Sequence, residues 1–197
     1  STLTGADAAN YALTQPTGLT ADITAVPQFT YGNLVVTRVG TGAAALTNAA
    51  NPTFLNEYTT TGTAGITVAL PTATSGNVNR ILSSGTATSE GQLNLSADGQ
   101  FLTIGGYDAV LGQASVNSTA GIPRVIARVN SVGTVVTSVL TSTTHASGFR
   151  SVVTTDGSRY WTAGNGVGVT SILHQGTTTP IAPTTISSTV TNLRTVN

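Results

Sequence analysis

The chain has 197 residues, no cysteine, no methionine and no lysine, and its seven arginines balance seven acidic residues to a net charge of zero. This composition excludes disulfides, thiolate metal sites, a cysteine nucleophile and lysine Schiff-base chemistry. There is no basic cluster and no apolar run near the roughly 18 residues that span a bilayer, so we expect no nucleic-acid partner and no membrane insertion.

Threonine, serine, glycine, alanine and valine dominate the chain. β-Branched residues suit strands, and glycine and serine suit turns, so this mixture predicts an all-β fold. The threonine-rich, low-charge composition also predicts an extracellular or cell-surface protein. A first residue other than methionine indicates a processed end within a longer precursor.

The first 27 residues read as a separate N-terminal β-strand segment or linker, because Pro16 and Gly18 interrupt it and Pro27 ends it. The stretch TGADAANYALTQPTGLTADIT resembles the closing strands of YDG or MBG-like repeat domains in large bacterial surface proteins. This resemblance implies the tail of a preceding β-domain, which could pair with an exposed sheet edge. A partly ordered linker is the alternative.

A β-repeat region follows, over residues 28–197. Residues 33–40 form an alternating strand, and residues 52–71 read as strand, Thr-Gly turn and strand. Residues 122–141 repeat that hairpin strand for strand.

Two further segments, residues 93–106 and 151–164, each combine an alternating strand, an Asp-Gly turn, a second strand and a glycine exit. The turns Asp98-Gly99 and Asp156-Gly157 lie 58 residues apart. We interpret all four turn residues as structural, because Asp tolerates positive φ and its side chain caps nearby backbone N–H groups. A period of this size is typical of a propeller or a solenoid.

The repeat divides the region into units at about residues 29–71, 91–141 and 149–183, each expected to hold four strands. The last residues, NLRTVN, read as a new strand cut short. The predicted fold is therefore all-β, with about three propeller-type four-stranded antiparallel blades. Closed propellers use about four to eight blades, so this ring would be incomplete. A β-sandwich or a β-solenoid is the alternative.

The segments VVTRVGTG, FLNEYTTTGT, GTATSEGQLNLSADGQFLTIGGYDA and RVIARVNSVGTV together resemble a family of secreted bacterial β-propeller proteins of unassigned activity. The resemblance covers about residues 30–175. It implies a bacterial extracellular or cell-surface location. The expected partners are further blades from the same precursor, a second chain or copies of this chain.

One candidate ligand-binding site follows from the alignment of the two Asp-Gly turns. Glu90 stands just before an inner strand, Gly148 falls opposite it, and Arg150 falls opposite Gln92. His145 lies on the equivalent loop. We therefore expect Glu90, His145 and Arg150 to converge at one end of the channel and bind a sugar or a carboxylate. A solvated loop charge or a salt bridge between blades is the alternative.

Neighbouring aromatic residues supply a further candidate. Tyr160 and Trp161 are adjacent in a strand and point to opposite faces, so one is expected in the core and the other, taken as Trp161, on a surface suited to carbohydrate. Asp108 is expected to pair with Arg124 or Arg128 across the outer strands.

No GxSxG, HExxH, P-loop or EF-hand motif and no cluster of histidines occurs, so we expect no catalytic residue, no metal and no cofactor. The leading hypothesis is a non-enzymatic extracellular structural or adhesive module within a larger surface assembly, with glycans as a further candidate partner. The alternative is a carbohydrate-binding or hydrolase or lyase propeller with its site at the blade entrances. A complete small β-protein is the third hypothesis.

Overall fold

A computed structural model describes residues 4–10, 12 and 26–197. Its regular structure is a single turn of 3-10 helix, η1 (Ala8–Asn10), and thirteen strands, with no α-helix among the described residues, so the all-β prediction is confirmed. Most of the predicted N-terminal strand segment, residues 1–27, lies outside the described residues. The part that is described contains η1 and no strand.

The strands form four antiparallel sheets. Their bounds are β1 (Leu34–Val39), β2 (Ala50–Asn51), β3 (Thr53–Tyr58), β4 (Ala64–Ala69), β5 (Ser83–Ser84), β6 (Asn94–Leu95), β7 (Phe101–Tyr107), β8 (Arg124–Asn130), β9 (Val135–Leu140), β10 (Phe149–Thr154), β11 (Arg159–Gly164), β12 (Val169–Leu173) and β13 (Thr184–Ser187).

The first sheet has the order β1-β3-β4 and therefore has three strands, where the repeat predicted four. The chain after β4 is rich in Asn, Ser and Gly, and only Ser83–Ser84 in it forms a ladder, pairing with β2. A two-residue ladder outside the first sheet thus replaces the expected fourth strand.

The second and third sheets each have four strands in chain order, β6-β7-β8-β9 and β10-β11-β12-β13. Their first hairpins contain the two Asp-Gly turns. Gly99 and Gly157 adopt φ values of 72° and 79°, whereas neither aspartate has positive φ. Glycine therefore takes the left-handed position in each turn, and the tolerance of Asp for positive φ is not used. Each aspartate accepts a backbone N–H two residues ahead, from Gln100 in one turn and Ser158 in the other.

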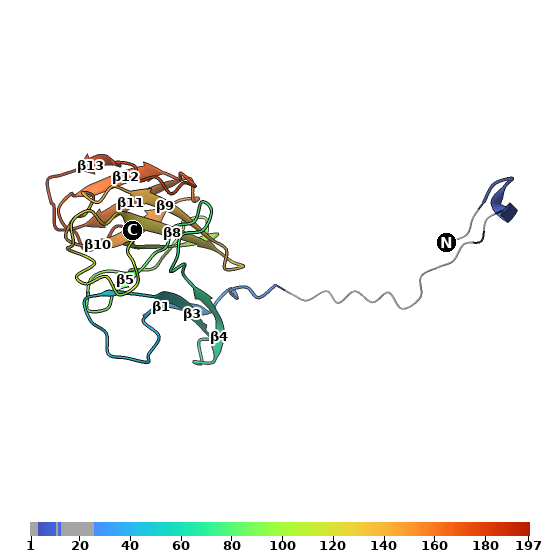
Figure 1. The fold of residues 1–197 in the computed structure, drawn as a ribbon, viewed down its shortest axis with the longest axis horizontal. Helices are drawn as coiled ribbons and strands as arrows, with labels where there is room; N and C mark the ends of the chain where they lie inside the picture. The colour runs from blue at the N-terminus through green and yellow to red at the C-terminus, as the bar shows by residue number, and fades with distance from the viewer. Residues whose placement is uncertain (1–3, 11, 13–25) are drawn as a thin grey trace.

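The three larger sheets are stacked face to face, with the second sheet between the first and the third (Figure 1). Strand β8 is apolar along most of its length because both of its faces are covered. Val125 and Val129 point into a core shared with Leu55 of the first sheet. Ile126 points the other way, into a core shared with Val152 of the third sheet.

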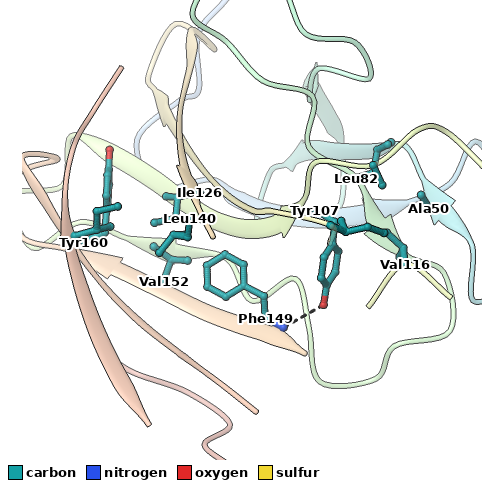
Figure 2. Close-up of a cluster of buried hydrophobic side chains, with 12 residues drawn as sticks. Ala50, Leu82, Tyr107, Val116, Ile126, Leu140, Phe149, Val152 and Tyr160 are labelled. Carbon is teal, nitrogen blue, oxygen red and sulfur yellow. Dashed lines mark hydrogen bonds between the residues drawn. The ribbon is translucent and has the colours of Figure 1, made fainter. Parts of the chain in front are cut away.

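The core between the second and third sheets is centred on Phe149, the first residue of β10 (Figure 2). A Cβ atom on Gly105 of β7 would lie only 2.8 Å from Cε1 of the Phe149 ring. The glycine thus allows the ring to lie directly on the backbone of β7. Figure 2 also shows the hydroxyl of Tyr107 directed at the backbone N–H of Phe149, which donates to it over 3.1 Å.

Segments at one edge of each of the three larger sheets are linked in series. Thr37 of β1 donates to the carbonyl of Gly91, and the N–H of Gln92 donates to the carbonyl of Arg150 in β10. Arg150 in turn donates to the carbonyl of Leu193 in the C-terminal segment. Within the described residues, no helix combines the length and apolar character needed to cross a bilayer.

Candidate functional site

The structure brings Glu90, His145 and Arg150 together where β10 begins. Gly148 marks the meeting point, because a Cβ atom there would lie 3.1 Å from Oε1 of Glu90 and 3.7 Å from Nε of Arg150. The ring of His145 stacks on that of Phe149, with 5.6 Å between ring centroids. Glycine at position 148 therefore leaves room for the carboxylate to approach the arginine.

Three further side chains complete this polar cluster, and sequence reasoning did not assign any of them to it. Tyr107 and Asn117 lie close enough to the carboxylate of Glu90 to lower its pKa, and Arg124 adds positive charge nearby. Tyr107 ends β7 and Arg124 begins β8, and these two residues are directly paired in the sheet. An alignment of the two hairpins could not find this pair, because its spacing is set by the loop between β7 and β8.

Glu90 is held in a partly buried position that disfavours its charge. Burial raises the pKa of its carboxyl above the usual value, while the side chains of Tyr107 and Asn117 and the two arginines oppose this rise. Oxygen Oε2 is buried and has no hydrogen-bond partner among the described residues. Neither arginine forms an ion pair with this carboxylate, since the one ion pair among the described residues joins Arg80 and Asp108.

That ion pair corrects a sequence prediction. Asp108 was expected to pair with Arg124 or Arg128, but its Oδ1 lies 2.6 Å from Nε of Arg80. The side chain of Asn79 donates to its other oxygen. The reason is local: Leu82 and Tyr107 exchange backbone hydrogen bonds, which brings the segment after β4 beside the end of β7.

Arg124 is almost fully buried and connects loops through their backbone carbonyls. Its guanidinium donates to the carbonyls of Ile122, His145 and Ala146, and it lies 5.0 Å from the centroid of the Tyr107 ring. Burial lowers its pKa, and nearby Tyr107 and Glu90 oppose that shift. The residue therefore joins the loop before β8 to the loop before β10.

Arg150 fastens the C-terminal segment to β10. Its Nη1 donates to Oδ1 of Asn192 over 2.5 Å and to the carbonyl of Leu193 over 2.8 Å. Its Nε is buried and has no hydrogen-bond partner among the described residues. Burial is the largest influence on its pKa, which is lowered.

His145 has a left-handed backbone conformation, with φ of 49°, which is uncommon for a residue other than glycine. Its side chain is fully buried, and Nε2 lies 2.8 Å from Oγ1 of Thr162. Burial lowers the pKa of the imidazole to about 4, and Arg124 and Arg150 add to this shift. The ring is therefore neutral near pH 7. Its Nδ1 has no hydrogen-bond partner among the described residues.

Trp161, the fourth predicted ligand-binding residue, lies apart from this cluster. It is in the middle of β11, opposite Val153 of β10 and Ser171 of β12, and is half-buried. Tyr160 is the member of the pair that lies in the core, where its hydroxyl is 3.0 Å from Nδ1 of His174. Burial raises the pKa of Tyr160 to about 12.

The cluster presents three buried atoms without a partner: Oε2 of Glu90, Nδ1 of His145 and Nε of Arg150. Such a set can donate to and accept from a polar molecule, and the pKa of the Glu90 carboxyl is raised by burial. Among the described residues, no three His, Asp or Glu side chains gather closely enough to hold a metal ion.

Comparisons with protein-family models, with curated proteins and with solved structures find no match for this chain.

Proposed function

We propose that this chain is a non-enzymatic structural or adhesive β-repeat module of an extracellular surface assembly, built from propeller-type blades. The observation that carries the proposal is that the two outermost sheet faces expose apolar side chains. The faces between the sheets, by contrast, are filled by two continuous apolar cores.

The first of these outer faces belongs to the β1-β3-β4 sheet. Leu34 and Val36 alternate with side chains that point toward the second sheet, and they are 57% and 44% exposed. Phe54 and Tyr58 of β3 lie on the same face and are half-buried. On this face Arg38 stacks over Phe54 at 4.0 Å and donates to Asn56. The exposed apolar side chains are therefore concentrated at Leu34 and Val36. Exposed apolar side chains on a sheet face are typical of a site that packs against another protein surface.

The second outer face belongs to the β10-β11-β12-β13 sheet. Val153 and Trp161 are neighbours on this face, and Leu173 near its edge is 51% exposed. The C-terminal segment covers only the part of the face around Ser151, whose hydroxyl contacts the backbone of Val196. The rest of the face is open to a further sheet.

The propeller-type arrangement is supported by the chain-order meander within each four-stranded sheet and by the serial links between edges of the three larger sheets. A neighbouring sheet, from a second copy or from another blade, would extend this stack on either outer face. The extracellular location is supported by the composition, which is rich in threonine, lacks lysine and contains few charged residues.

The non-enzymatic part of the proposal is supported by the way the arginines of the polar cluster are used. Arg124 and Arg150 donate to backbone carbonyls of loops and of the C-terminal segment. These contacts hold separate parts of the chain together, which is a structural role.

Sedimentation velocity of the purified chain over a range of concentrations tests this proposal. We expect a species larger than the 19.8 kDa monomer, and we expect Val36→Asp and Leu173→Asp each to return it to the monomer. Val110→Asp is the matched control, because Val110 is even more exposed but lies in a loop outside both faces. A stable, protease-resistant monomer at all concentrations would contradict the proposal.

A second candidate function is a ligand-binding or hydrolytic site at the polar cluster. It is favoured by the three partnerless buried atoms of Glu90, His145 and Arg150. Its test is hydrolysis of a panel of glycan, ester and peptide substrates by the wild type, by Glu90→Gln and by Asp98→Asn as a control. Turnover that disappears only in Glu90→Gln would favour this candidate over the structural role, and no turnover in any of the three proteins would count against the hydrolytic version.

A further inference from the structure

A cleft of about 470 Å³ lies between the first and second sheets, and it is separate from the polar cluster. One side is formed by residues 29–33, which lead into β1. The other side is formed by the β6–β7 hairpin and by the end of β8. The volume is within the range of about 300–1,000 Å³ that is typical of pockets for small ligands.

Aromatic and aliphatic side chains form much of the cleft. Phe29 and Phe101 are half-buried in its walls, and Leu95 is 62% exposed. Tyr31 also lines the cleft and is fully exposed. An aromatic ring with its polar tip in water is a side chain that often takes part in binding.

The polar groups of the cleft carry no formal charge. Asn33, Gln100 and Asn130 contribute amide side chains, and no Asp, Glu, Arg, Lys or His is among the lining residues. Charged groups beside the cleft already have partners. Asp98, next to the cleft, accepts from the hydroxyl of Ser96 and from the N–H of Gln100. Arg128 stacks over Phe101 and donates to the carbonyl of Gly157, and the carboxylate of Glu57 accepts three hydrogen bonds.

Tyr31 is held at the cleft by a turn that is firmly fixed. The N–H of Asn33 donates to the carbonyl of Thr30 over 3.1 Å, and Gly32 takes the φ of 88° that this turn requires. Glu57 then binds both ends of the turn, accepting the N–H of Thr30 over 2.6 Å and the side-chain amide of Asn33 over 2.9 Å.

A second connection fixes the same segment to the other side of the cleft. The N–H of Phe29 donates to the carbonyl of Ser131, in the turn between β8 and β9, over 2.7 Å. The backbone that carries the exposed tyrosine is therefore fixed before any ligand arrives. Such preorganisation reduces the entropy that binding would otherwise cost.

We propose that this cleft binds a neutral saccharide, with the Tyr31 ring stacked against the apolar face of a sugar and the amides of Gln100 and Asn130 bonded to its hydroxyl groups. The uncharged amides suit a ligand that carries no charge, and the aromatic and aliphatic walls suit the C–H surface of a sugar. This site is distinct from the two outer faces, so it does not depend on the assembly proposed above.

The test is isothermal titration of the whole chain with four neutral hexasaccharides, of glucose, xylose, mannose and N-acetylglucosamine, and with the hexasaccharide of galacturonic acid as an anionic probe. We expect one or more neutral probes to bind with an affinity that salt does not change. Tyr31→Ala should weaken that affinity about tenfold or more, as truncation of a central aromatic contact does, and Gln100→Ala should weaken it as well.

Leu34→Ala is the matched control, because this nearby exposed side chain lies on the outer face of β1, away from the cleft. It should leave saccharide affinity unchanged. The proposal is overturned if no neutral probe binds at millimolar concentration, or if Tyr31→Ala binds as well as the wild type. It is equally overturned if only the anionic probe binds and Glu90→Gln or Arg150→Gln changes that binding, since this would place the sugar site at the polar cluster.

Discussion

The carboxylate of Glu57 accepts the backbone N–H of Thr30 over 2.6 Å, although the two residues are 27 positions apart. Glu57 is only 3% exposed, and its other oxygen accepts the N–H of Ile66 over 3.1 Å. A single carboxylate thus joins the turn before β1 to the β3–β4 hairpin. Gly65 allows this arrangement, because a Cβ atom there would lie 2.8 Å from Cδ of Glu57.

Gly65→Ala should therefore destabilise the protein by about 1–3 kcal/mol, because the added methyl group displaces a carboxylate that three donors need. Glu57→Gln should have a cost of similar size, since an amide cannot accept from Ile66 and from Thr30 at once. Urea denaturation measures both changes. Thr67→Ala, at an exposed position of the same strand, is the control and should change stability by less than about 0.5 kcal/mol.

Glu57 also predicts a loss of stability in acid. The hydrogen bond from Thr30 is the largest of the influences that hold its pKa below the usual 4.5. A carboxyl whose pKa is lower in the folded state contributes stability that is complete above the unfolded pKa and is lost as pH falls below it. Glu57→Gln should therefore lose less stability than the wild type between pH 5 and pH 3, and parallel curves would contradict this prediction.

We expect His145 to make the stability of the protein depend on pH in a higher pH range than Glu57 does. Its folded pKa of about 4 is below the usual 6.5, so the unfolded chain binds a proton that the folded protein does not. The resulting stability is complete above pH 6.5 and decreases as pH falls toward 4, by roughly 3 kcal/mol in total. His174 acts in the same direction, and Glu90, with a raised pKa, acts in the opposite one.

His145→Asn isolates this contribution, because asparagine accepts the left-handed backbone that His145 adopts. The variant will be less stable at pH 7, but its stability should change less between pH 7 and pH 4.5 than that of the wild type. Urea denaturation at several pH values gives both slopes. His174→Asn serves as the comparison, and it should flatten the curve by a smaller amount because His174 is less buried. Equal slopes for the wild type and His145→Asn would refute the assignment.

The sequence was sufficient for the strand pattern of the second sheet and for the first three strands of the third, because these depend on local signals. The fourth strand of the third sheet, β13, lies at Thr184–Ser187, beyond the predicted unit that ended at residue 183. Alternating residues and an Asp-Gly turn recur in each, and glycine at the left-handed position closes the hairpin. The first sheet was predicted less well. The expected fourth strand is absent because the chain after β4 instead pairs Ser83–Ser84 with Ala50–Asn51. This contact joins short segments that have no periodic pattern in the sequence.

In the polar cluster, too, the residues placed by local sequence signals were predicted and those placed by long-range pairing were not. The turn alignment placed Glu90 near Gly148 and Arg150, and these residues are close in the structure. Tyr107 and Arg124 could not be placed in this way, since they meet across the β7–β8 ladder after a long irregular loop. Trp161 was predicted as a separate ligand-binding residue from its residue type, and its strand position puts it on the opposite face of the third sheet from the core.

Tyr107→Phe should reveal the polar link between the cluster and the core. It removes the hydroxyl that accepts the N–H of Phe149 and leaves that buried donor without a partner, so we expect a loss of about 1–3 kcal/mol. Tyr58→Phe is the control, because the half-buried Tyr58 hydroxyl has no hydrogen-bond partner among the described residues. Thermal unfolding followed by circular dichroism compares the two. Equal stability of both variants would show that the Tyr107 contact contributes little.

Arg150→Gln should release the C-terminal segment without unfolding the sheets. The side chain loses its bonds to Asn192 and Leu193, while the β10–β11 ladder is unaffected. Hydrogen exchange should then become faster at the N–H of Leu193, which donates to the carbonyl of Gly164 in the wild type. Exchange at Val152 should not change. Arg159→Gln, on β11, is the control and should leave the exchange at Leu193 as it is.

The two Asp-Gly turns allow one further comparison, because they share a backbone conformation but differ in their surroundings. Gly99→Ala meets open space, so its cost should be limited to placing alanine at positive φ, about 1 kcal/mol. At Gly157 a Cβ atom would also lie 2.5 Å from Nη1 of Arg128 and 3.1 Å from Cε2 of Phe101. Arg128 cannot easily move aside, because it stacks over Phe101 and donates to the carbonyl of Gly157.

Gly157→Ala should therefore destabilise the protein by about 1–3 kcal/mol more than Gly99→Ala does. Arg128→Ala relieves the overlap, so the extra cost of Gly157→Ala should largely disappear in that background. A double-mutant cycle in urea measures this coupling. Equal costs for the two glycine substitutions in the wild type, or an unchanged difference after Arg128→Ala, would mean that backbone conformation alone makes glycine necessary at both turns.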